Sequence, residues 1–391
     1  MSRLARVAAR AAIPPFYVME VARAAGERER AGHEVFHLEV GQPSTGLPER
    51  ARAAVQEAMA AGPLGYTDAE GTPALRRRIA RHYRERHGVE VPVERIVVTT
   101  GASAAFTLAF LASFDAGDRV AAAAPGYPCY RNALSAFGVE NVTLAVGEDT
   151  RFHPTPTMLA AAGRLAGLVV ASPSNPTGTA LRAAELEALA EYCESERVQL
   201  VVDEIYQEIT YGRTAPTALA ISEDAIVINS FSKYWSMTGW RVGWLVAPPE
   251  LVGPIERLAQ NLMLAPPTVG QVAALAAMDC DEELAGHVAR YASNREVLLT
   301  GLPAAGMSRL APADGAFYAW ADVSGFGLDS QELARRWLDD TGVAATPGID
   351  FDPVRGRDWM RFSFAGTGAD MSEAMTRLAA WADRHHPPLT A

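Results

Sequence analysis

The order of apolar segments along the chain predicts a doubly wound α/β domain with a mostly parallel sheet. Short runs rich in Val, Ile and Ala recur through the middle of the chain, and helical patterns such as residues 182–197 lie between some of them. Several runs are apolar throughout, which is typical of strands buried on both faces of a parallel sheet. Strands that alternate with helices indicate this fold class. The runs are RIVVTT (95–100), DRVAAAA (118–124), NVTLAV (141–146), GLVVAS (167–172), VQLVVDE (198–204), AIVINS (225–230) and RVGWLVA (241–247).

A second, smaller domain is predicted by a change of pattern after residue 285. Helical segments there alternate with short strands such as GAFYAWADV (315–323) and WMRFSFA (359–365). We therefore expect a large α/β domain over residues 45–285. We expect the smaller α+β domain to combine residues 1–44 with residues 286–391.

Composition limits the classes of partner. The chain has 391 residues and a formal net charge of −11, which disfavours nucleic acid and anionic membrane surfaces as partners. No apolar run approaches the roughly 18 residues that a membrane helix needs. We therefore expect neither nucleic acid nor a membrane among the partners.

The N-terminal segment MSRLARVAARAAIPPF (1–16) is rich in Arg, and the first acidic residue of the chain is Glu20. This composition suits a transit peptide, but we expect an arm or helix of the mature protein. The three cysteines are odd in number and far apart, which predicts a reducing compartment, the cytoplasm, and no metal site. Cys129 is expected to be a packed, inert thiol.

The segment TPALRRRIARHYRERHG (72–88) contains six arginines, so a nucleic-acid patch is one interpretation. Leu75, Ile79 and Tyr83, however, recur at a spacing of four residues and form one apolar stripe. Such a stripe with arginines around it is typical of a solvated amphipathic helix, which is the interpretation we favour.

Lys233 lies in NSFSKYWSMTGWRVGW (229–244), a segment that contains no acidic residue. Desolvation disfavours the charged form of a lysine, and a neutral amine is the form that attacks a carbonyl to form a Schiff base. A surface lysine after a strand is the simpler interpretation. The polar residues at neighbouring strand ends favour the chemical one.

Asp203 and Tyr206 end the run VQLVVDEIY, and Asn175 lies in the turn PSNPTG (173–178) after the preceding run. Carboxyl ends of parallel strands are where open α/β sheets build their sites. An acid directly after an apolar strand is costly without a cationic partner, and a pyridinium nitrogen would be one. Tyr206 would donate a hydrogen bond to a phenolate oxygen, and the Asn175 amide would point into the same site.

Gly101, Ala102 and Ser103 follow the run RIVVTT and begin a long apolar helix. Small residues and free N–H groups at a helix N-terminus suit a phosphate, although Ser103 would equally cap the helix. No G-x-x-x-x-G-K-[ST] motif occurs, so a P-loop is excluded. A phosphate cradle, a pyridinium partner, an oxygen donor and an amine nucleophile together match pyridoxal 5′-phosphate.

Three segments in this order, SNPTG, VVDEIY and SFSKYWSMTGWRVGW, resemble the signatures of the class I/II aminotransferases of pyridoxal-phosphate fold type I. The resemblance covers about residues 10–385. It implies a seven-stranded, mostly parallel sheet between helices, with a smaller α+β domain. It also implies ping-pong transfer of an amino group from an L-amino acid to a 2-oxo acid.

The resemblance implies a role for each matching residue. Lys233 would be the Schiff-base lysine and proton shuttle, and Asp203 would keep the pyridine nitrogen protonated. Tyr206 and Asn175 would contact the phenolic oxygen of the ring, and Tyr127 would stack on the ring. The residues implied to hold the phosphate are Ala102, Ser103, Ser230, Ser232 and Arg241.

Substrate binding and assembly are implied in the same way. Arg361 matches the arginine that binds the substrate α-carboxylate, with help from Gly41 and Asn175. Tyr66 matches the tyrosine that reaches the phosphate of the neighbouring subunit, which implies a homodimer with shared active sites. The chain departs from many relatives at Ser44-Thr45, where they have Asp-Phe, and this leaves the substrate entrance open.

The segment AQNLMLAPPTVGQ (259–271) is used to predict the preferred substrate side chain. It contains no Lys or Arg. Gln260 occupies the place of an arginine that some dicarboxylate-specific relatives take from the partner subunit, and residues 262–264 are apolar. We therefore expect neutral donors, aromatic or aliphatic, to outperform aspartate. A carbon–sulfur β-lyase or a decarboxylase on the same fold remains an alternative, and a non-catalytic cofactor-sensing regulator is a remote one.

Overall fold

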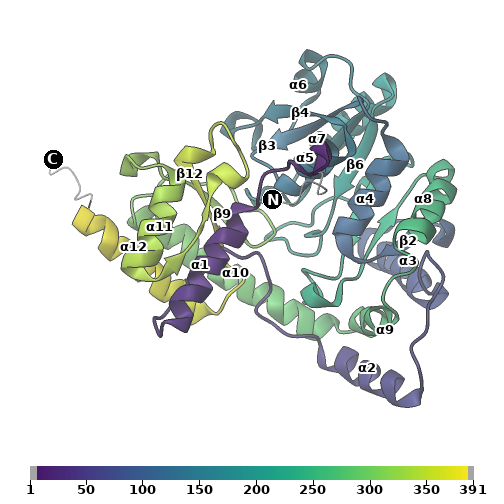
Figure 1. Cartoon of the computed structure of the whole chain (residues 1–391), viewed down its shortest axis with the longest axis horizontal. Helices are drawn as coiled ribbons and strands as arrows, with labels where there is room; N and C mark the ends of the chain where they lie inside the picture. Colours follow the sequence, from purple (N-terminus) through teal and green to yellow (C-terminus); the bar gives the residue numbers. More distant parts are fainter. Residues whose placement is uncertain (1–6, 386–391) are drawn as a thin grey trace.

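The computed structural model describes residues 7–385, and a twisted seven-stranded sheet forms the centre of its larger part (Figure 1). The strands follow one another in the order β2-β8-β7-β6-β5-β3-β4, and β8 alone runs antiparallel to its two neighbours. The seven predicted runs are therefore confirmed as strands of one mostly parallel sheet. They are β2 (Ile96–Thr99), β3 (Arg119–Ala124), β4 (Glu140–Ala145), β5 (Gly167–Ala171), β6 (Gln199–Asp203), β7 (Ile226–Ser230) and β8 (Gly243–Val246).

Helices cover both faces of this sheet, which explains why its strands are apolar throughout. On β6, Val201 packs with the helices α4, α5 and α8 on one face, while Leu200 and Val202 pack with α6 and α7 on the other. Burial of apolar side chains on both faces is the main force that holds these layers together. The helices of this part are α2 (Glu49–Ala61), α3 (Pro73–His87), α4 (Gly101–Ser113), α5 (Pro128–Phe137), α6 (Pro156–Ala161), α7 (Ala183–Glu196), α8 (Pro249–Leu262) and α9 (Thr268–Ala277).

A smaller part of the molecule holds the C-terminal segment together with the N-terminal helix (Figure 1). Its three-stranded antiparallel sheet has the order β11-β12-β9, and β1 pairs in parallel with β10. The expected boundary at residue 285 falls inside helix α10, and the division into two domains stays a prediction. The elements are α1 (Tyr17–Arg30), β1 (Phe36–His37), α10 (Asp281–Ala304), β9 (Tyr318–Asp322), α11 (Ser330–Thr341), β10 (Val343–Ala344), β11 (Thr346–Pro347), β12 (Trp359–Ser363) and α12 (Gly368–His385).

The arginine-rich segment is helix α3, as the apolar stripe predicted. Leu75 and Ile79 are fully buried and Tyr83 is nearly so. Gly88 ends the helix in the left-handed conformation with φ 68°, a position that glycine adopts without steric cost. Within residues 7–385, none of the helices combines the length and the apolar character that crossing a membrane would require.

The N-terminal segment falls only partly within the described chain. Residues 1–6 of the predicted arm lie outside it, and a short 3-10 helix over Ala9–Ala11 precedes α1. Helix α1 contacts α11, β10 and β11 of the smaller part. Whether this segment belongs to the mature protein stays a prediction.

Candidate active site

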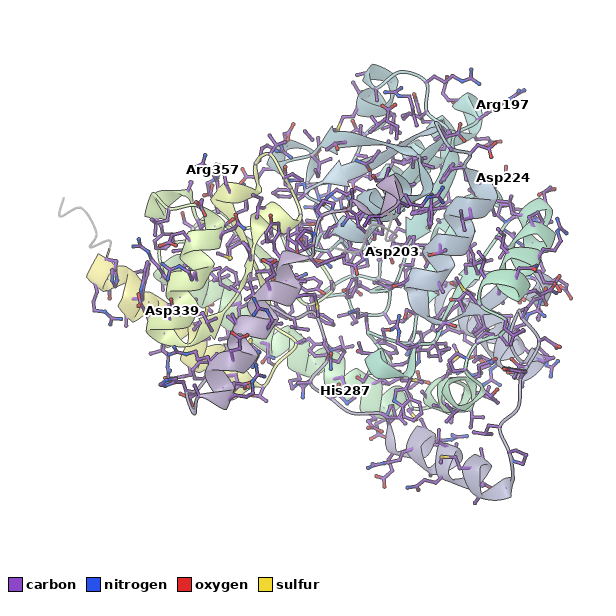
Figure 2. The ribbon with its side chains drawn as sticks, viewed as in Figure 1. Arg197, Asp203, Asp224, His287, Asp339 and Arg357 are labelled. Carbon is purple, nitrogen blue, oxygen red and sulfur yellow. The ribbon has the colours of Figure 1, made fainter. Side chains whose placement is uncertain are left out.

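A cavity of about 330 Å³ lies at the carboxyl ends of β5 and β6, between the two parts of the molecule. Figure 2 places Asp203 in this central region. Seven of the predicted site residues line the cavity: Gly41, Tyr127, Asn175, Asp203, Tyr206, Lys233 and Arg361. Eight further lining residues are Phe16, Val18, Met19, Val40, Tyr130, Ala171, Ile205 and Tyr318.

Lys233 lies three residues beyond the end of β7, and its Nζ donates a hydrogen bond of 2.6 Å to the carbonyl oxygen of Gly41. Burial and the nearby charge of Arg361 lower the pKa of Lys233 to about 8, although Asp203 acts in the opposite direction. A larger share of neutral amine is therefore present near neutral pH than for a solvated lysine. This is the property that the sequence predicted for a nucleophile.

Asp203 is the last residue of β6, and its side chain is buried. Burial raises the pKa of Asp203 to about 6, while hydrogen bonds from the Tyr130 hydroxyl and from the Ile205 N–H (3.0 Å) favour the carboxylate. A cation bound against this carboxyl group would stabilise its charged form further. Asp203 is thus placed to pair with a cationic group in the cavity.

Two tyrosines fix the wall beside Lys233. The hydroxyl groups of Tyr206 and Tyr318 are hydrogen-bonded at 2.7 Å, and both rings are buried. A Cβ atom at Gly41 would lie 1.8 Å from the Tyr318 hydroxyl oxygen, so only glycine fits at this position. The close approach brings the Gly41 carbonyl within reach of Lys233.

Arg361 on β12 is buried, and aromatic rings hold its guanidinium. The guanidinium carbon lies 4.5 Å from the ring centroid of Tyr318 and 4.7 Å from that of Phe351. Its Nη1 donates to Asn175 Oδ1 (2.9 Å), and its Nη2 donates to Thr346 Oγ1 (3.2 Å) and to the Glu39 carbonyl. Its buried Nε finds no hydrogen-bond partner among the described residues. A fixed guanidinium with a donor to spare suits a carboxylate ligand.

The residues predicted to bind the phosphate lie near the first turn of α4. Ser230 Oγ donates to Ser232 Oγ (2.9 Å) and accepts from the Ser232 N–H (3.1 Å). Gly101 has φ 76°, and a Cβ atom there would lie 2.3 Å from Arg241 Nη2. The glycine therefore lets the arginine approach the first turn of α4, where N–H groups and a cation attract an anion.

The two remaining residues predicted to bind the phosphate are Ala102 and Ser103, in the first turn of α4. Ala102 is half-buried, and Ser103 is exposed. Thr100 precedes the first residue of α4, so Ser103 is the third residue of the helix and does not cap it. The capping interpretation of Ser103 is therefore wrong. The structure leaves its role toward a phosphate untested.

Tyr66 and the loop expected to select the substrate lie away from the cavity of this subunit. Tyr66 is 86% exposed, and Leu262 and Leu264 are 56% and 52% exposed. The segment around Tyr66 is bound to the start of α9, since Gln271 Nε2 donates to Thr67 Oγ1 (3.0 Å). Gln260 is exposed and donates to Glu256 on its own helix.

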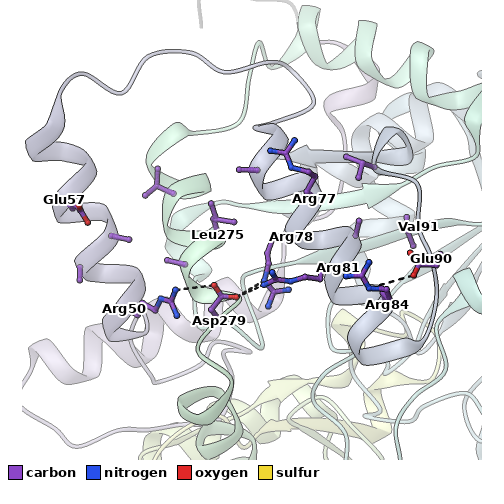
Figure 3. Close-up of a pocket in the computed structure, with 17 residues that line it drawn as sticks. Arg50, Glu57, Arg77, Arg78, Arg81, Arg84, Glu90, Val91, Leu275 and Asp279 are labelled. Carbon is purple, nitrogen blue, oxygen red and sulfur yellow. Dashed lines mark hydrogen bonds and ion pairs between the residues drawn. The ribbon is translucent and has the colours of Figure 1, made fainter.

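A larger hollow of about 980 Å³ lies between α2, α3 and α9. Figure 3 shows arginines of α3 and Arg50 of α2 pointing toward it, with Asp279 between them. Asp279 pairs with Arg78 (2.8 Å), Arg81 (3.2 Å) and Arg50 (3.5 Å). None of the predicted site residues lines this hollow.

Comparison with known proteins decides the family. The sequence pattern of the family described as aminotransferase class I and II matches residues 33–378. The chain belongs to this family. The valine–pyruvate aminotransferase of Mycobacterium tuberculosis is 50% identical over 381 residues, which are 96% of this chain and 98% of the relative. A crystal structure of an aminotransferase from Mycobacterium tuberculosis superimposes with a TM-score of 0.95 at 50% identity, covering 97% of this chain and 100% of the other.

A more distant aminotransferase gives the same assignment. The aspartate/prephenate aminotransferase of Thermus thermophilus is 32% identical, covering 94% of this chain and 96% of the relative. The expected fold, the expected family and the expected transfer of an amino group between an amino acid and a 2-oxo acid are therefore confirmed. These comparisons favour neither the lyase and decarboxylase alternatives nor a non-catalytic regulator.

Two contributors to the site escaped the sequence analysis. Tyr130 bonds Asp203 from 73 residues away, and Tyr318 bonds Tyr206 from 112 residues away. Both lie inside segments that read as ordinary apolar elements. A tyrosine within a buried strand or helix was the only available signal, since a buried hydroxyl usually finds a partner.

Proposed function

We propose that this aminotransferase uses pyridoxal 5′-phosphate, and that the central cavity holds it. The residues fit the group: the buried carboxyl of Asp203 suits the pyridine nitrogen, and the cradle at Gly101 and Arg241 suits the phosphate. The cofactor would supply an aldehyde and an electron-withdrawing ring. Ser230 and Ser232 would add hydrogen bonds to the phosphate, and Tyr127 would cover the ring.

We assign the proton movement to Lys233. Its pKa of about 8 lets the amine accept a proton near neutral pH and return it, as general acid–base catalysis requires. Arg361 would bind the substrate α-carboxylate through the donors that its fixed guanidinium offers, and so orient the Cα–H bond. Asn175 and Tyr206 would hold the phenolic oxygen of the cofactor ring.

The charged residues that line the cavity support a proposal about the side chain of the amino donor. Lys233 and Arg361 are the only Lys or Arg residues among the described residues that line it, and both have roles already. Phe16, Val40 and Ile205 are apolar, so a second substrate carboxylate would lose water without gaining a cation. We therefore propose a donor with a neutral side chain.

The acceptor is proposed from the relatives. The relative at 50% identity is a valine–pyruvate aminotransferase, and this name supports valine-like donors with pyruvate as acceptor. The Thermus thermophilus relative, by contrast, is named for aspartate and prephenate, so the family alone does not fix the side chain.

A kinetic panel tests the proposal. We would measure kcat/KM for valine, leucine, phenylalanine, methionine, alanine, aspartate and glutamate with pyruvate as acceptor, and follow the absorbance of the bound cofactor. Valine or another neutral donor should lead, with aspartate at least about tenfold lower. Aspartate exceeding every neutral donor by more than about tenfold would contradict the neutral side chain.

We further propose a homodimer with shared sites in the cytoplasm. Leu64, Tyr66, Leu262 and Leu264 are exposed, and hydrogen bonds from α9 to residues 65–67 place the Tyr66 segment beside α9. Burial of these side chains against a second copy would be favourable, and Tyr66 would then reach the partner's phosphate. The cysteines, free within the described chain, suit a reducing compartment.

Subunit mixing tests the shared site. A Lys233→Ala chain mixed with a Tyr66→Ala chain should regain activity, because some dimers would combine one intact site with one doubly damaged site. Subunit exchange is verified separately by mass. Full exchange with no recovered activity would show that each chain builds its site alone.

A further inference from the structure

A second cluster of titratable side chains lies outside the central cavity and has no role in the proposed mechanism. His82 and His87 come from the end of α3, and Glu208 follows Tyr206 by two residues. The Nε2 atoms of His82 and His87 lie 3.1 Å and 2.9 Å from the same oxygen, Glu208 Oε1. The three side chains are 7%, 4% and 11% exposed, so water has little access to them.

The geometry of the cluster is that of ligands around a common centre. One ligand atom from each residue lies within 4.8 Å of the other two. The His87 contact has hydrogen-bond geometry, whereas the buried Nε2 of His82 finds no hydrogen-bond partner among the described residues despite its short distance to Glu208. The His82 nitrogen therefore contacts the carboxylate without a well-formed hydrogen bond, and a ligand shared by the three residues would satisfy it better.

We propose that His82, His87 and Glu208 form a binding site for a divalent transition-metal ion of the Zn²⁺ type. Two imidazole nitrogens and one carboxylate oxygen are a recognised donor set for such ions. Ligands at about 2.0–2.2 Å from a tetrahedral zinc lie roughly 3.3–3.6 Å from one another. The two distances to Glu208 Oε1 are a few tenths of an ångström shorter, and the third pair of ligand atoms lies within 4.8 Å, so the side chains would shift to receive an ion.

The site is structural and lies outside the catalytic cavity. It joins the C-terminal end of α3 to the segment that carries Asp203 and Tyr206. The His82 ring also packs edge-on against Trp235 at 5.5 Å between ring centroids, and Trp235 follows Lys233 by two residues. A bound ion would therefore stiffen the back of the active site, and the fluorescence of Trp235 would report its binding.

The spacing explains why the sequence gives no warning of this cluster. Residues five apart on a regular helix do not share a face, but His87 is the last residue of α3 and Gly88 turns the chain in the left-handed conformation. Glu208 is 121 residues away from His87. A metal motif with helical i, i+4 spacing is absent here.

The test uses the holoenzyme after dialysis against a chelator, with Zn²⁺ and then Co²⁺ as probes. We expect one ion per chain with a Kd below about 10 μM, a rise in Tm of several degrees and a change in tryptophan emission. Co²⁺ should give absorption bands at wavelengths longer than those of the cofactor. His82→Gln, His87→Gln and Glu208→Gln should each weaken binding by at least about tenfold, the loss already typical of residues that only orient a ligand.

His33→Gln is the matched control, because His33 is exposed and far from the cluster in sequence. It should bind the ion as the parent chain does. The metal-free Tm and the circular dichroism of each variant show whether it is folded. Absence of stoichiometric binding to the parent chain would overturn the proposal, and so would binding that survives in folded His82→Gln and His87→Gln. Either result would leave the cluster as a hydrogen-bonded carboxylate between two histidines.

Discussion

The central cavity and the larger hollow between α2, α3 and α9 both contain charged side chains, but the two differ in how much most of these side chains are exposed to water. In the cavity, Arg361 is 3% exposed and Asp203 is 2% exposed, and burial shifts the pKa values of Asp203 and Lys233 toward neutrality. In the hollow, the side chains of Arg81 and Arg84 are 45% and 55% exposed, that of Arg78 is 9% exposed, and all three face acids of the same chain. Volume therefore does not identify the candidate site, and the shifted pKa values of Asp203 and Lys233 in the smaller cavity are the better guide.

The largest expected effect comes from Lys233→Ala. The variant removes both the amine nucleophile and the proton carrier, so turnover should fall by more than about 10⁴-fold. The fold should persist, because the one hydrogen bond that this side chain makes within residues 7–385 is to the Gly41 carbonyl. Steady-state turnover and the absorbance of the bound cofactor are the measurements. Turnover near that of the parent chain would remove the basis of the proposed mechanism.

Asp203→Asn should have the next largest effect. An amide keeps the shape of the side chain but cannot balance a cationic ring nitrogen, so kcat should fall by about 10³-fold, which corresponds to about 4 kcal/mol. Because an amide has one acceptor oxygen, it cannot accept from both the Tyr130 hydroxyl and the Ile205 N–H as the carboxylate does. A loss of less than tenfold would show that the charge of Asp203 has no part in the reaction.

Arg361→Lys tests the contrast between the two regions most directly. Lysine keeps the charge but loses the planar fork, so kcat/KM should fall by about 10²-fold, mostly through KM. Arg84→Gln in the hollow is the matched control and should leave kcat/KM unchanged. Its effect on the free energy of unfolding should stay below about 0.5 kcal/mol. Equal effects of the two variants would break the comparison.

His37 is an intermediate case, half-exposed beside the buried Glu39 that precedes Gly41. The hydrogen bond that His37 Nδ1 donates to the Glu39 carboxylate, with the charges of Glu39 and Glu29, raises the pKa of His37 to about 9 although burial opposes the shift. The folded pKa lies above the unfolded value near 6.5, so the stabilisation is fully present below pH 6.5 and is lost as pH rises through 9.

His37→Gln should therefore lower the Tm at pH 6 and converge with the parent chain above about pH 9.5. Because water screens the half-exposed ring, the difference in unfolding free energy should not exceed about 1 kcal/mol. Thermal melts at pH 6, 8 and 10 provide the measurement. A difference that grows with pH would contradict the sign of the shift.

The parts of the site that the sequence predicted are those that depend on neighbours along the chain. Asp203 and Lys233 follow recognisable strands, and the topology of a doubly wound sheet brings strand ends together. Tyr130, Tyr318 and the cluster at Glu208 depend on contacts between segments more than 70 residues apart. Their partners are set by side-chain packing in three dimensions, which local patterns of polarity do not encode. Tyr66 and the 262–264 loop depend on a second chain, and their roles stay predictions.

The antiparallel pairing of β7 with β8 predicts how slowly the segment around Lys233 exchanges its amide hydrogens with solvent. Ser230 pairs with Gly243, so residues 231–242 form a ring that the central sheet closes at its base. Inside the ring, Met237 N–H donates to the Phe231 carbonyl (3.1 Å), and the Thr238 hydroxyl donates to the Ser232 carbonyl (2.9 Å). The buried, hydrogen-bonded amides of Phe231 and Met237 should exchange with solvent about as slowly as those of the sheet core, because they open when β7 and β8 separate. Lys233 would thus be carried by one of the last segments to lose protection before global unfolding.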